Sequence, residues 1–508
     1  MRKLVIGIDS GTQSTKALVV DADKGEVLGE ASAAYGLIEG LPTGSKEQDP
    51  QTWTDALEKS VTGALKKARV RSGEVVAIGV SGQQHGFVPL DSKGDVIRPA
   101  KLWCDTSTIE ECEILTEGIG GKSKAIKAIG NAFLPGFTAP KVLWLKRHEP
   151  RNFKKLDTVL LPHDYLNFWL TGEKVMECGD ASGTALFDVR KREYSGEVME
   201  LIDSKLAGCM PRLIGSEEPS GYLRSAAAER LGLNGRILVS AGGGDNMMGA
   251  IGTGNTRPGV VTASFGTSGT IYGCSDKPVI DPRGEIAAFC DSTNRWMPLL
   301  CTMNVTVATE MVRRQFGMDH ATFEKKAKSV PAGSNGLLML PYLEGERTPS
   351  VPDGTGVFFG LRNETFNEAH MARAAMEGVT LGMNYGLNRL RQLKMPTTQI
   401  RATGGGAKSR TWLQMMADIF NAEVVTLKVS EGAAYGAALQ AIWSWRLSNG
   451  DQVTIDEIAS RFVKVDGRRR FQPDSQASER YRELQALQDQ LSTSLQKCFP
   501  IHRQLIDH

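Results

Sequence analysis

Paired cysteines, long apolar runs and a strong net charge are all missing from this chain of 508 residues. Its eight cysteines are scattered, without a C-x-x-C pair or a neighbouring histidine cluster. Neither a zinc site nor a disulfide framework is therefore expected, and a reducing cytoplasm fits best. Without a run of eighteen apolar residues, no membrane span is predicted. Only five apolar residues follow the basic start, too few for a secretory signal.

The charge balance argues against a general nucleic-acid binder. The net charge is +2, so the protein has no global basic field. The one short basic run, Arg468 to Arg470, is interpreted as a solvated turn in preference to a phosphate contact.

The two common nucleotide-binding motifs are also missing. Residues 121–123 resemble the end of a Walker A loop, but Thr116 stands where its first glycine is required. Two glycine pairs, at 242/244 and 404/406, begin like a dinucleotide-binding fingerprint. Met247 and Ser409 replace its third glycine. Any nucleotide site must therefore use another architecture.

Length and periodicity predict an α/β protein with more than one domain. A chain of 508 residues is longer than one hydrophobic core usually serves. Apolar strands at residues 4–8 and 75–80 flank a helical pattern at residues 53–69, and this alternation favours α/β architecture. A strand and glycine turn at residues 260–267 repeat the opening of the chain. We expect two halves, 1–245 and 246–508, around a central cleft.

The second half adds three expected elements. Residues 365–368 read as a capping box that opens a long helix. Residues 400–427 read as a strand, helix, strand unit. Residues 474–496 form an amphipathic pattern, and this last helix is expected to dock on the body.

Asp9 ends the first apolar strand and precedes a string rich in glycine and hydroxyl residues, 10–16. The common interpretation is an aspartate that bonds the amides of its own turn. Backbone N–H groups and hydroxyls in such a turn can also cradle phosphate oxygens. A carboxylate beside phosphates needs a cation between them, so Asp9 implies Mg²⁺, held partly through water.

Asp245 follows three glycines, 242–244, after a second apolar run. An N-cap of the following helix is the commoner role for such an aspartate. Three glycines exceed what a cap requires and allow a ligand to approach the backbone. A carboxylate there can accept the proton of an attacking hydroxyl group. In phosphoryl transfer this carboxylate acts as the base.

Gln84 and His85 lie between glycines where another strand ends. Amide and imidazole side chains suit a hydroxyl-rich ligand, although a single histidine is more often a structural hydrogen bonder. Trp103 and Asp105 offer an apolar wall and an acceptor to the same ligand. A half-buried tryptophan and a turn aspartate are the plainer interpretation of that pair.

The sites at Asp9, Gln84–His85 and Asp245, in this order along the chain, resemble those of the FGGY family of carbohydrate kinases, part of the actin-like ATPase superfamily. Residues 136–148, 341–349, 356–361 and 403–409 also resemble family signatures, and the resemblance runs from about Val5 to about Ala441. Residues 82–86 are most similar to the xylulokinases of the family. Gln84 stands where many bacterial xylulokinases have methionine.

The resemblance implies two ribonuclease-H-like domains flanking a cleft, in which ATP phosphorylates D-xylulose to D-xylulose 5-phosphate. Asp245 is then the base for the terminal hydroxyl, and Asp9 organises Mg²⁺ and the ATP phosphates. The remaining implied contacts are Thr12, Gln13, Ser14, Gly266 and Thr267 for phosphates, Gly405, Gly406 and Ala407 for adenosine, and Gln84, His85 and Asn246 for sugar hydroxyls. A homodimer is expected from the family alone.

Two other functions remain open at this point. The substrate could be ribulose, another ketose or a sugar alcohol, because one inverted hydroxyl is hard to read from sequence. The chain could also be a nucleotide-dependent binding module, like the chaperones and filament proteins of the superfamily. The Gln84–His85 site and the lack of a large peptide-binding β-domain argue against that second function.

Overall fold

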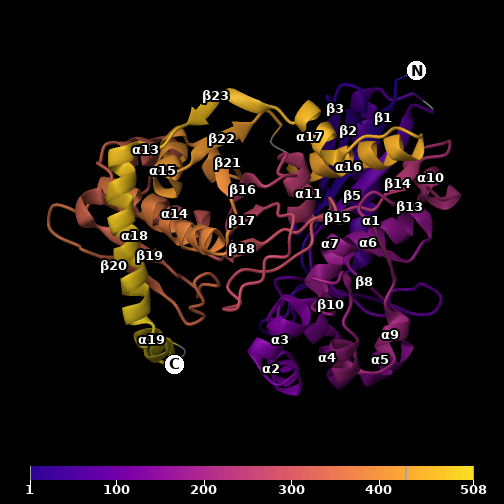
Figure 1. The fold of residues 1–508 in the computed structure, drawn as a ribbon, viewed down its shortest axis with the longest axis horizontal. Helices are drawn as coiled ribbons and strands as arrows, with labels where there is room; N and C mark the ends of the chain where they lie inside the picture. Colours follow the sequence, from indigo (N-terminus) through magenta and orange to yellow (C-terminus); the bar gives the residue numbers. More distant parts are fainter. Residues whose placement is uncertain (1, 72, 430–431, 507–508) are drawn as a thin grey trace.

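Two six-strand paths of mixed sheet, one in each half of the chain, organise the fold (Figure 1). The computed structural model describes residues 2–71, 73–429 and 432–506. The first sheet has the order β13-β14-β5-β1-β2-β3, with β15 also on β5, and the second has the order β23-β22-β21-β16-β17-β18. The strands of the first sheet are β1 (Leu4–Ser10), β2 (Ser14–Asp21), β3 (Val27–Ala34), β5 (Val75–Gly82), β13 (Pro219–Tyr222), β14 (Leu238–Ser240) and β15 (Gly243–Gly244). Those of the second are β16 (Gly259–Phe265), β17 (Gly269–Gly273), β18 (Leu299–Thr302), β21 (Thr397–Thr403), β22 (Glu423–Leu427) and β23 (Val465–Phe471).

The two sheets repeat the same pattern of strand directions. Counted from β3 in the first sheet and from β18 in the second, two antiparallel pairs are followed by two parallel pairs and one more antiparallel pair. The hairpin β1–β2 therefore corresponds to β16–β17, and the parallel partner β5 corresponds to β21. The predicted repeat of two similar α/β halves is confirmed.

The two halves also share elements. Helix α16 (Gly432–Ser448) belongs to the second half, yet it packs against β1 and β5 of the first sheet. A side chain at Gly7 of β1 would lie 2.0 Å from the Ala434 carbonyl oxygen, so this close approach requires glycine. Helix α11 (Asp245–Gly252), where the predicted boundary falls, packs on α16.

Four of the longer helices agree with the sequence prediction. They are α1 (Pro50–Ala68), α14 (Glu368–Gln392), α15 (Arg410–Phe420) and α18 (Ser475–Leu495). Helix α18 docks on the second half through Tyr481 and Leu484, as expected. The predicted capping box of α14 is wrong. Asn367 is the N-cap and accepts the N–H of His370 at 3.2 Å, while Thr365 Oγ1 accepts the Arg362 N–H at 2.9 Å.

The interpretation of residues 468–470 as a solvated turn is also wrong, because these arginines lie inside strand β23. Alternation of exposed and half-buried side chains along this edge strand produces a polar sequence without apolar periodicity.

The remaining elements surround the two sheets, and none of the described helices is long and apolar enough to cross a membrane. In the first half they are β4 (Glu47–Gln48), β6 (Val88–Leu90), β7 (Ala100–Lys101), α2 (Ile109–Gly118), α3 (Lys122–Ile129), α4 (Thr138–His148), α5 (Pro150–Lys155), β8 (Thr158–Leu160), α6 (Pro162–Thr171), β9 (Val175–Glu177), α7 (Cys178–Ala181), η1 (Ser182–Thr184), β10 (Phe187–Asp188), β11 (Glu193–Tyr194), α8 (Gly196–Ile202), α9 (Leu206–Cys209), β12 (Arg212–Ile214) and α10 (Ser225–Leu231). In the second half they are α12 (Thr306–Gln315), α13 (His320–Lys328), η2 (Ser334–Gly336), β19 (Leu338–Pro341), β20 (Gly356–Phe359), η3 (Gly406–Lys408), α17 (Ile455–Phe462) and α19 (Cys498–Ile506).

Candidate active site

The register of three strands brings the two predicted carboxylates to one sheet edge. Asp9 of β1 pairs with Ser81 of β5, and Gly243 of β15 pairs with Ser81 from the other side. All three strands are parallel there, so their carboxyl ends meet at the same edge. Asp245 follows two residues after Gly243. The Ser81 hydroxyl donates to Asp9 Oδ1 at 2.8 Å and holds that carboxylate in place.

Asp245 is the first residue of α11 and is not its N-cap, because Gly244 occupies that position. The Asn246 amide donates to Asp245 Oδ1 at 2.9 Å. Burial, followed by the negative charge of Asp9, raises the pKa of Asp245 to about 7. A carboxyl group with that pKa can take up or release a proton near neutral pH, as a general base must.

Two of the predicted sugar contacts, Gln84 and Asn246, lie beside Asp245. Gln84 is buried, and its Oε1 accepts the Asn246 amide at 2.8 Å. His85 has its Nδ1 2.8 Å from the carbonyl oxygen of Gly183. Burial, then the charge of Lys141, lowers the pKa of His85 to about 3, so the imidazole is neutral. A neutral ring that donates Nδ1–H to that carbonyl presents Nε2 as an acceptor.

A buried lysine fixes the backbone of His85, which has a φ of 64° in the left-handed region. Lys141 Nζ donates to the His85 carbonyl oxygen at 2.8 Å and to the Gly136 carbonyl oxygen at 2.6 Å. The Thr138 hydroxyl donates to the same His85 oxygen at 3.1 Å. The string at 136–148 was identified from sequence only as a family-like signature. The contact between Lys141 and His85 joins two segments that are distant in the sequence, so no local sequence pattern predicts it.

Trp103 and Asp105 have different surroundings. Trp103 Nε1 donates to the Thr12 hydroxyl at 2.9 Å, which connects it to the turn after β1. Asp105 is fully buried, and its Oδ1 accepts the Ser107 N–H at 3.0 Å while its Oδ2 accepts the Lys46 N–H at 2.8 Å. Both Asp105 oxygens are thus engaged inside the protein, as in the turn-aspartate interpretation.

The two predicted phosphate turns occupy equivalent hairpins of the two sheets. Thr12 and Gln13 lie between β1 and β2, next to Ser14, whose carbonyl accepts the Gly11 N–H at 3.0 Å. Gly266 and Thr267 lie between β16 and β17. Their carbonyls accept N–H groups at the start of α12, at 2.9 and 3.0 Å.

The second hairpin adjoins both Asn246, the neighbour of Asp245, and the predicted adenosine loop. The Thr270 hydroxyl of β17 donates to Asn246 Oδ1 at 3.3 Å. The glycine loop after β21 lies against the hairpin, since a side chain at Gly404 would be 2.6 Å from the Phe265 carbonyl oxygen. Gly405 is exposed in this loop, and Gly406 and Ala407 are buried.

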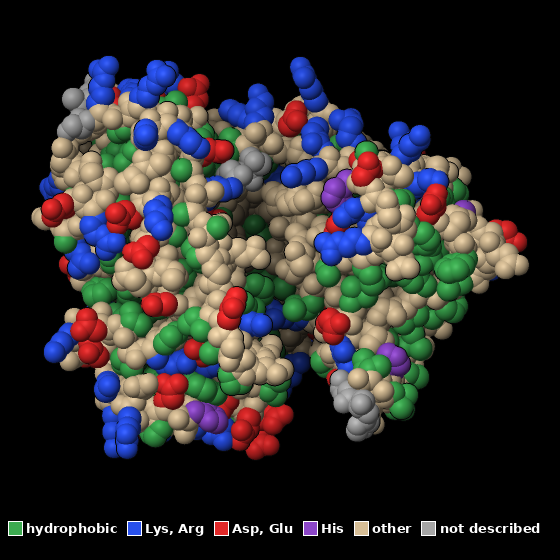
Figure 2. Space-filling model, turned by 180° about the vertical axis from the view of Figure 1, so that it is seen from behind, with side chains coloured by type: hydrophobic (Ala, Val, Ile, Leu, Met, Phe, Trp, Pro, Cys, Tyr) green, Lys and Arg blue, Asp and Glu red, His purple; other side chains and the backbone are tan. Residues whose placement is uncertain are grey.

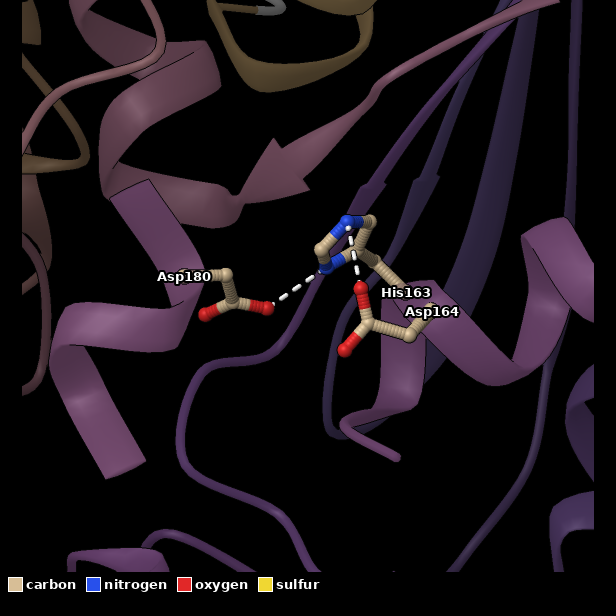
Figure 3. Close-up of side chains that lie close together, drawn as sticks. All are labelled: His163, Asp164 and Asp180. Atoms are coloured by element: carbon tan, nitrogen blue, oxygen red, sulfur yellow. Dashed lines mark hydrogen bonds and ion pairs between the residues drawn. The ribbon is translucent and has the colours of Figure 1, made fainter. Parts of the chain in front are cut away.

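A buried ion cluster joins helices α6 and α7 of the first half (Figure 3). His163 Nδ1 is 2.5 Å from Asp180 Oδ2, and His163 Nε2 is 3.1 Å from Asp164 Oδ1. Burial opposes protonation of His163, but the two carboxylates outweigh it and raise its pKa to about 9. Among the described residues this is the one group with metal-ligand spacing. Only the Asp180 contact is a hydrogen bond, and burial raises the pKa of Asp164 to about 7, so the arrangement is an imidazolium hydrogen-bonded to Asp180 with Asp164 beside its other nitrogen.

The ion cluster touches the backbone that carries Asp245. A side chain at Gly242 would lie 3.0 Å from His163 Cδ2, and one at Gly244 would lie 3.0 Å from Asp180 Oδ1. The charge of Asp180 also contributes to the raised pKa of Asp245. The sequence prediction missed this cluster, because its members come from two separate helices.

A groove separates two lobes of the molecule (Figure 2). One cavity of about 390 Å³ is lined from both halves, with Phe133 and Leu134 on one side and Met303 and Arg347 on the other. Besides burial, the charge of Arg347 helps to lower the pKa of His85, so this cavity lies close to one of the predicted sugar contacts.

Comparison with known proteins identifies the family of the chain. Two models of the FGGY family of carbohydrate kinases match the chain, the N-terminal domain over residues 4–252 and the C-terminal domain over residues 261–445. A xylulose kinase of Haemophilus influenzae is 41% identical over 477 residues, covering 93% of this chain and 96% of the relative. A xylulose kinase of Bacillus subtilis is 35% identical over 490 residues, covering 95% of each chain. The solved structure of xylulose kinase from Rhodospirillum rubrum has a TM-score of 0.87 at 27% identity, covering 98% of this chain and 100% of that one. The chain belongs to the FGGY family of carbohydrate kinases.

Proposed function

We propose that this protein transfers the γ-phosphoryl group of ATP to the terminal hydroxyl of D-xylulose, forming D-xylulose 5-phosphate and ADP. The observation that carries the reaction is the position of Asp9 and Asp245 at one sheet edge, with the pKa of Asp245 raised to about 7. The names of the relatives that are 41% and 35% identical over nearly the whole chain support the choice of sugar.

Asp245 is proposed as the base. The sugar hydroxyl gives its proton to the Asp245 carboxylate while its oxygen bonds to the γ-phosphorus. The bond from that phosphorus to the bridging oxygen breaks, and ADP leaves. Because the transition state of phosphoryl transfer is loose, the base needs correct position more than high basicity. The hydrogen bond from Asn246 to Asp245 Oδ1 orients the carboxylate.

Asp9 is proposed as the ligand of a divalent metal, Mg²⁺. Its half-buried carboxylate is oriented by Ser81 and lies beside the turn that follows β1, which suits a hard cation with several waters. When bound, such an ion neutralises phosphate charge that Asp9 alone would repel. Thr12, Gln13 and Ser14 in the first hairpin and Gly266 and Thr267 in the second are proposed to contact the phosphates. Gly405, Gly406 and Ala407 are proposed to receive the adenosine.

The sugar is proposed to lie between His85 and Asp245. His85 Nε2, Gln84 and Asn246 offer acceptors and donors to hydroxyl groups, and Trp103 stands as a partly apolar wall. Asp105 is left out of the proposed contacts because its oxygens are bonded inside the protein.

All eight cysteines are free, which supports the proposed cytoplasmic location. A homodimer stays a family-level proposal.

ADP release with Mg-ATP and a panel of sugars tests this function. D-xylulose, ribulose, other ketoses and sugar alcohols are compared at equal concentration, with a sugar-free reaction as background. D-xylulose is expected to give the highest kcat/KM. A higher value for another sugar would overturn the proposed substrate. Turnover that no sugar stimulates would instead favour a nucleotide-dependent binding module.

A further inference from the structure

Strand β23 lies beyond residues 261–445, the part of the second half that matches the family model. It forms the edge of the second sheet and runs antiparallel to β22. Successive side chains of a strand point to opposite faces. Among the three consecutive arginines, Arg468 and Arg470 are exposed and Arg469 is half-buried.

The middle arginine bonds the predicted adenosine loop. An Nη of Arg469 donates to the carbonyl oxygen of Ala407 at 3.0 Å and to that of Lys408 at 2.6 Å. Its neighbours have other partners. Arg470 pairs with Glu423 at 3.1 Å, and the side chain of Arg468 extends from the exposed face.

The sequence of the loop at 404–408 does little to fix its conformation, so contacts from outside the loop must hold it. Three consecutive glycines, 404–406, give the unbound backbone wide freedom, which costs entropy when the loop adopts one conformation. Gly404 has a φ of 82°, and Gly406 is held under Trp412 and Phe265. Residues 406–408 form the short helix η3, and Arg469 holds the carbonyls of its last two residues.

We infer that Arg469 is a positioning residue for nucleotide binding, which holds the loop at 404–408 in the conformation that receives the adenosine. It acts through the Ala407 and Lys408 carbonyls and not through contact with the reacting atoms. This inference rests on the proposed function, because the loop is assigned to adenosine there. It also gives the segment after residue 445 a part in ATP binding.

The three arginines provide matched variants for the test. Arg469→Ala should raise the KM for Mg-ATP and the Kd for ADP, measured without sugar, by about tenfold, because hydrogen bonds from a charged donor are lost. The KM for the sugar should change less than about twofold. Arg469→Lys should recover part of the affinity, since one donor remains. Arg468→Ala and Arg470→Ala should leave both nucleotide constants within about twofold of the wild type.

Hydrogen exchange at residues 404–409 supplies a readout that does not depend on turnover. Faster exchange in Arg469→Ala, and not in Arg468→Ala, is the expected result. If Arg469→Ala binds ADP as tightly as Arg468→Ala, the inference is wrong. If wild-type protein binds ADP without protecting this loop, the proposed adenosine site fails instead. Should Arg469→Ala not fold, the comparison of Arg469→Lys with Arg468→Lys decides in the same way.

Discussion

Asp9 and Asp245 lie at the same edge of the first sheet because β1, which carries Asp9, and β15, which immediately precedes Asp245, flank one residue, Ser81. Their charges interact, and the negative charge of Asp9 adds to burial in raising the pKa of Asp245 to about 7. The raised pKa suits Asp245 to exchanging a proton near neutral pH.

The activity should therefore depend on pH near neutrality. Asp245 must be ionised to accept a proton, and its raised pKa keeps it protonated at lower pH. We expect kcat/KM for the sugar to rise with pH, with an acid limb near pH 7. The stability effect has the opposite sign, because between about pH 4 and 7 the unfolded chain releases this proton while the folded protein keeps it, so the free energy of unfolding falls as pH rises through that window. A flat kcat/KM between pH 5.5 and 8 would contradict the assignment.

Replacing Asp9 should change the titration of its neighbour. In Asp9→Asn without nucleotide, the pKa of Asp245 should fall, because one of the charges that raise it is gone. Carbon-detected NMR of labelled aspartate carboxyls measures this directly and needs no activity. Asp23→Asn, at an exposed turn, is the control. An unchanged Asp245 titration would mean that the two carboxylates do not interact.

Replacing Lys141 should raise the KM for the sugar and leave the KM for ATP nearly unchanged. Lys141→Met removes the donors that hold the His85 carbonyl, so His85 should lose its fixed position. The sugar KM is expected to rise about tenfold, with the ATP KM changed less than about twofold. Lys146→Met on the same helix is a matched control, because Lys146 is partly exposed and pairs with Asp203. Equal effects on both substrates would indicate general disruption.

The buried ion cluster should contribute to stability in a pH-dependent way. His163→Gln leaves Asp180 buried without its cation and should lower the free energy of unfolding by about 3–5 kcal/mol. His148→Gln, which loses a half-exposed pair with Glu111, should cost about 1 kcal/mol or less. Because the pKa of His163 is raised to about 9, its contribution is complete below pH 6.5 and is lost as pH rises through 9. Urea unfolding at pH 6 and pH 9.5 measures the difference, and a larger loss at pH 9.5 would contradict the charged pair.

The sequence predicted those features that depend on local pattern. Strands that end in glycine turns identified both aspartates, and the repeated glycine–threonine turn indicated two similar halves. Contacts between distant segments were not predictable, which is why Lys141 and the His163–Asp180 pair were missed. Competition between neighbouring polar residues explains the N-cap error at Thr365, because Asn367 stands closer to the first helical turn.

The catalytic assignment of Asp245 has the most direct test in the single-turnover rate of Asp245→Asn. The amide keeps the size of the side chain, so sugar and ADP affinities should stay within about threefold of the wild type. Loss of the base should lower the rate of phosphoryl transfer by about 10²–10⁴-fold. A rate equal to that of the wild type, with both ligands bound, would contradict the account.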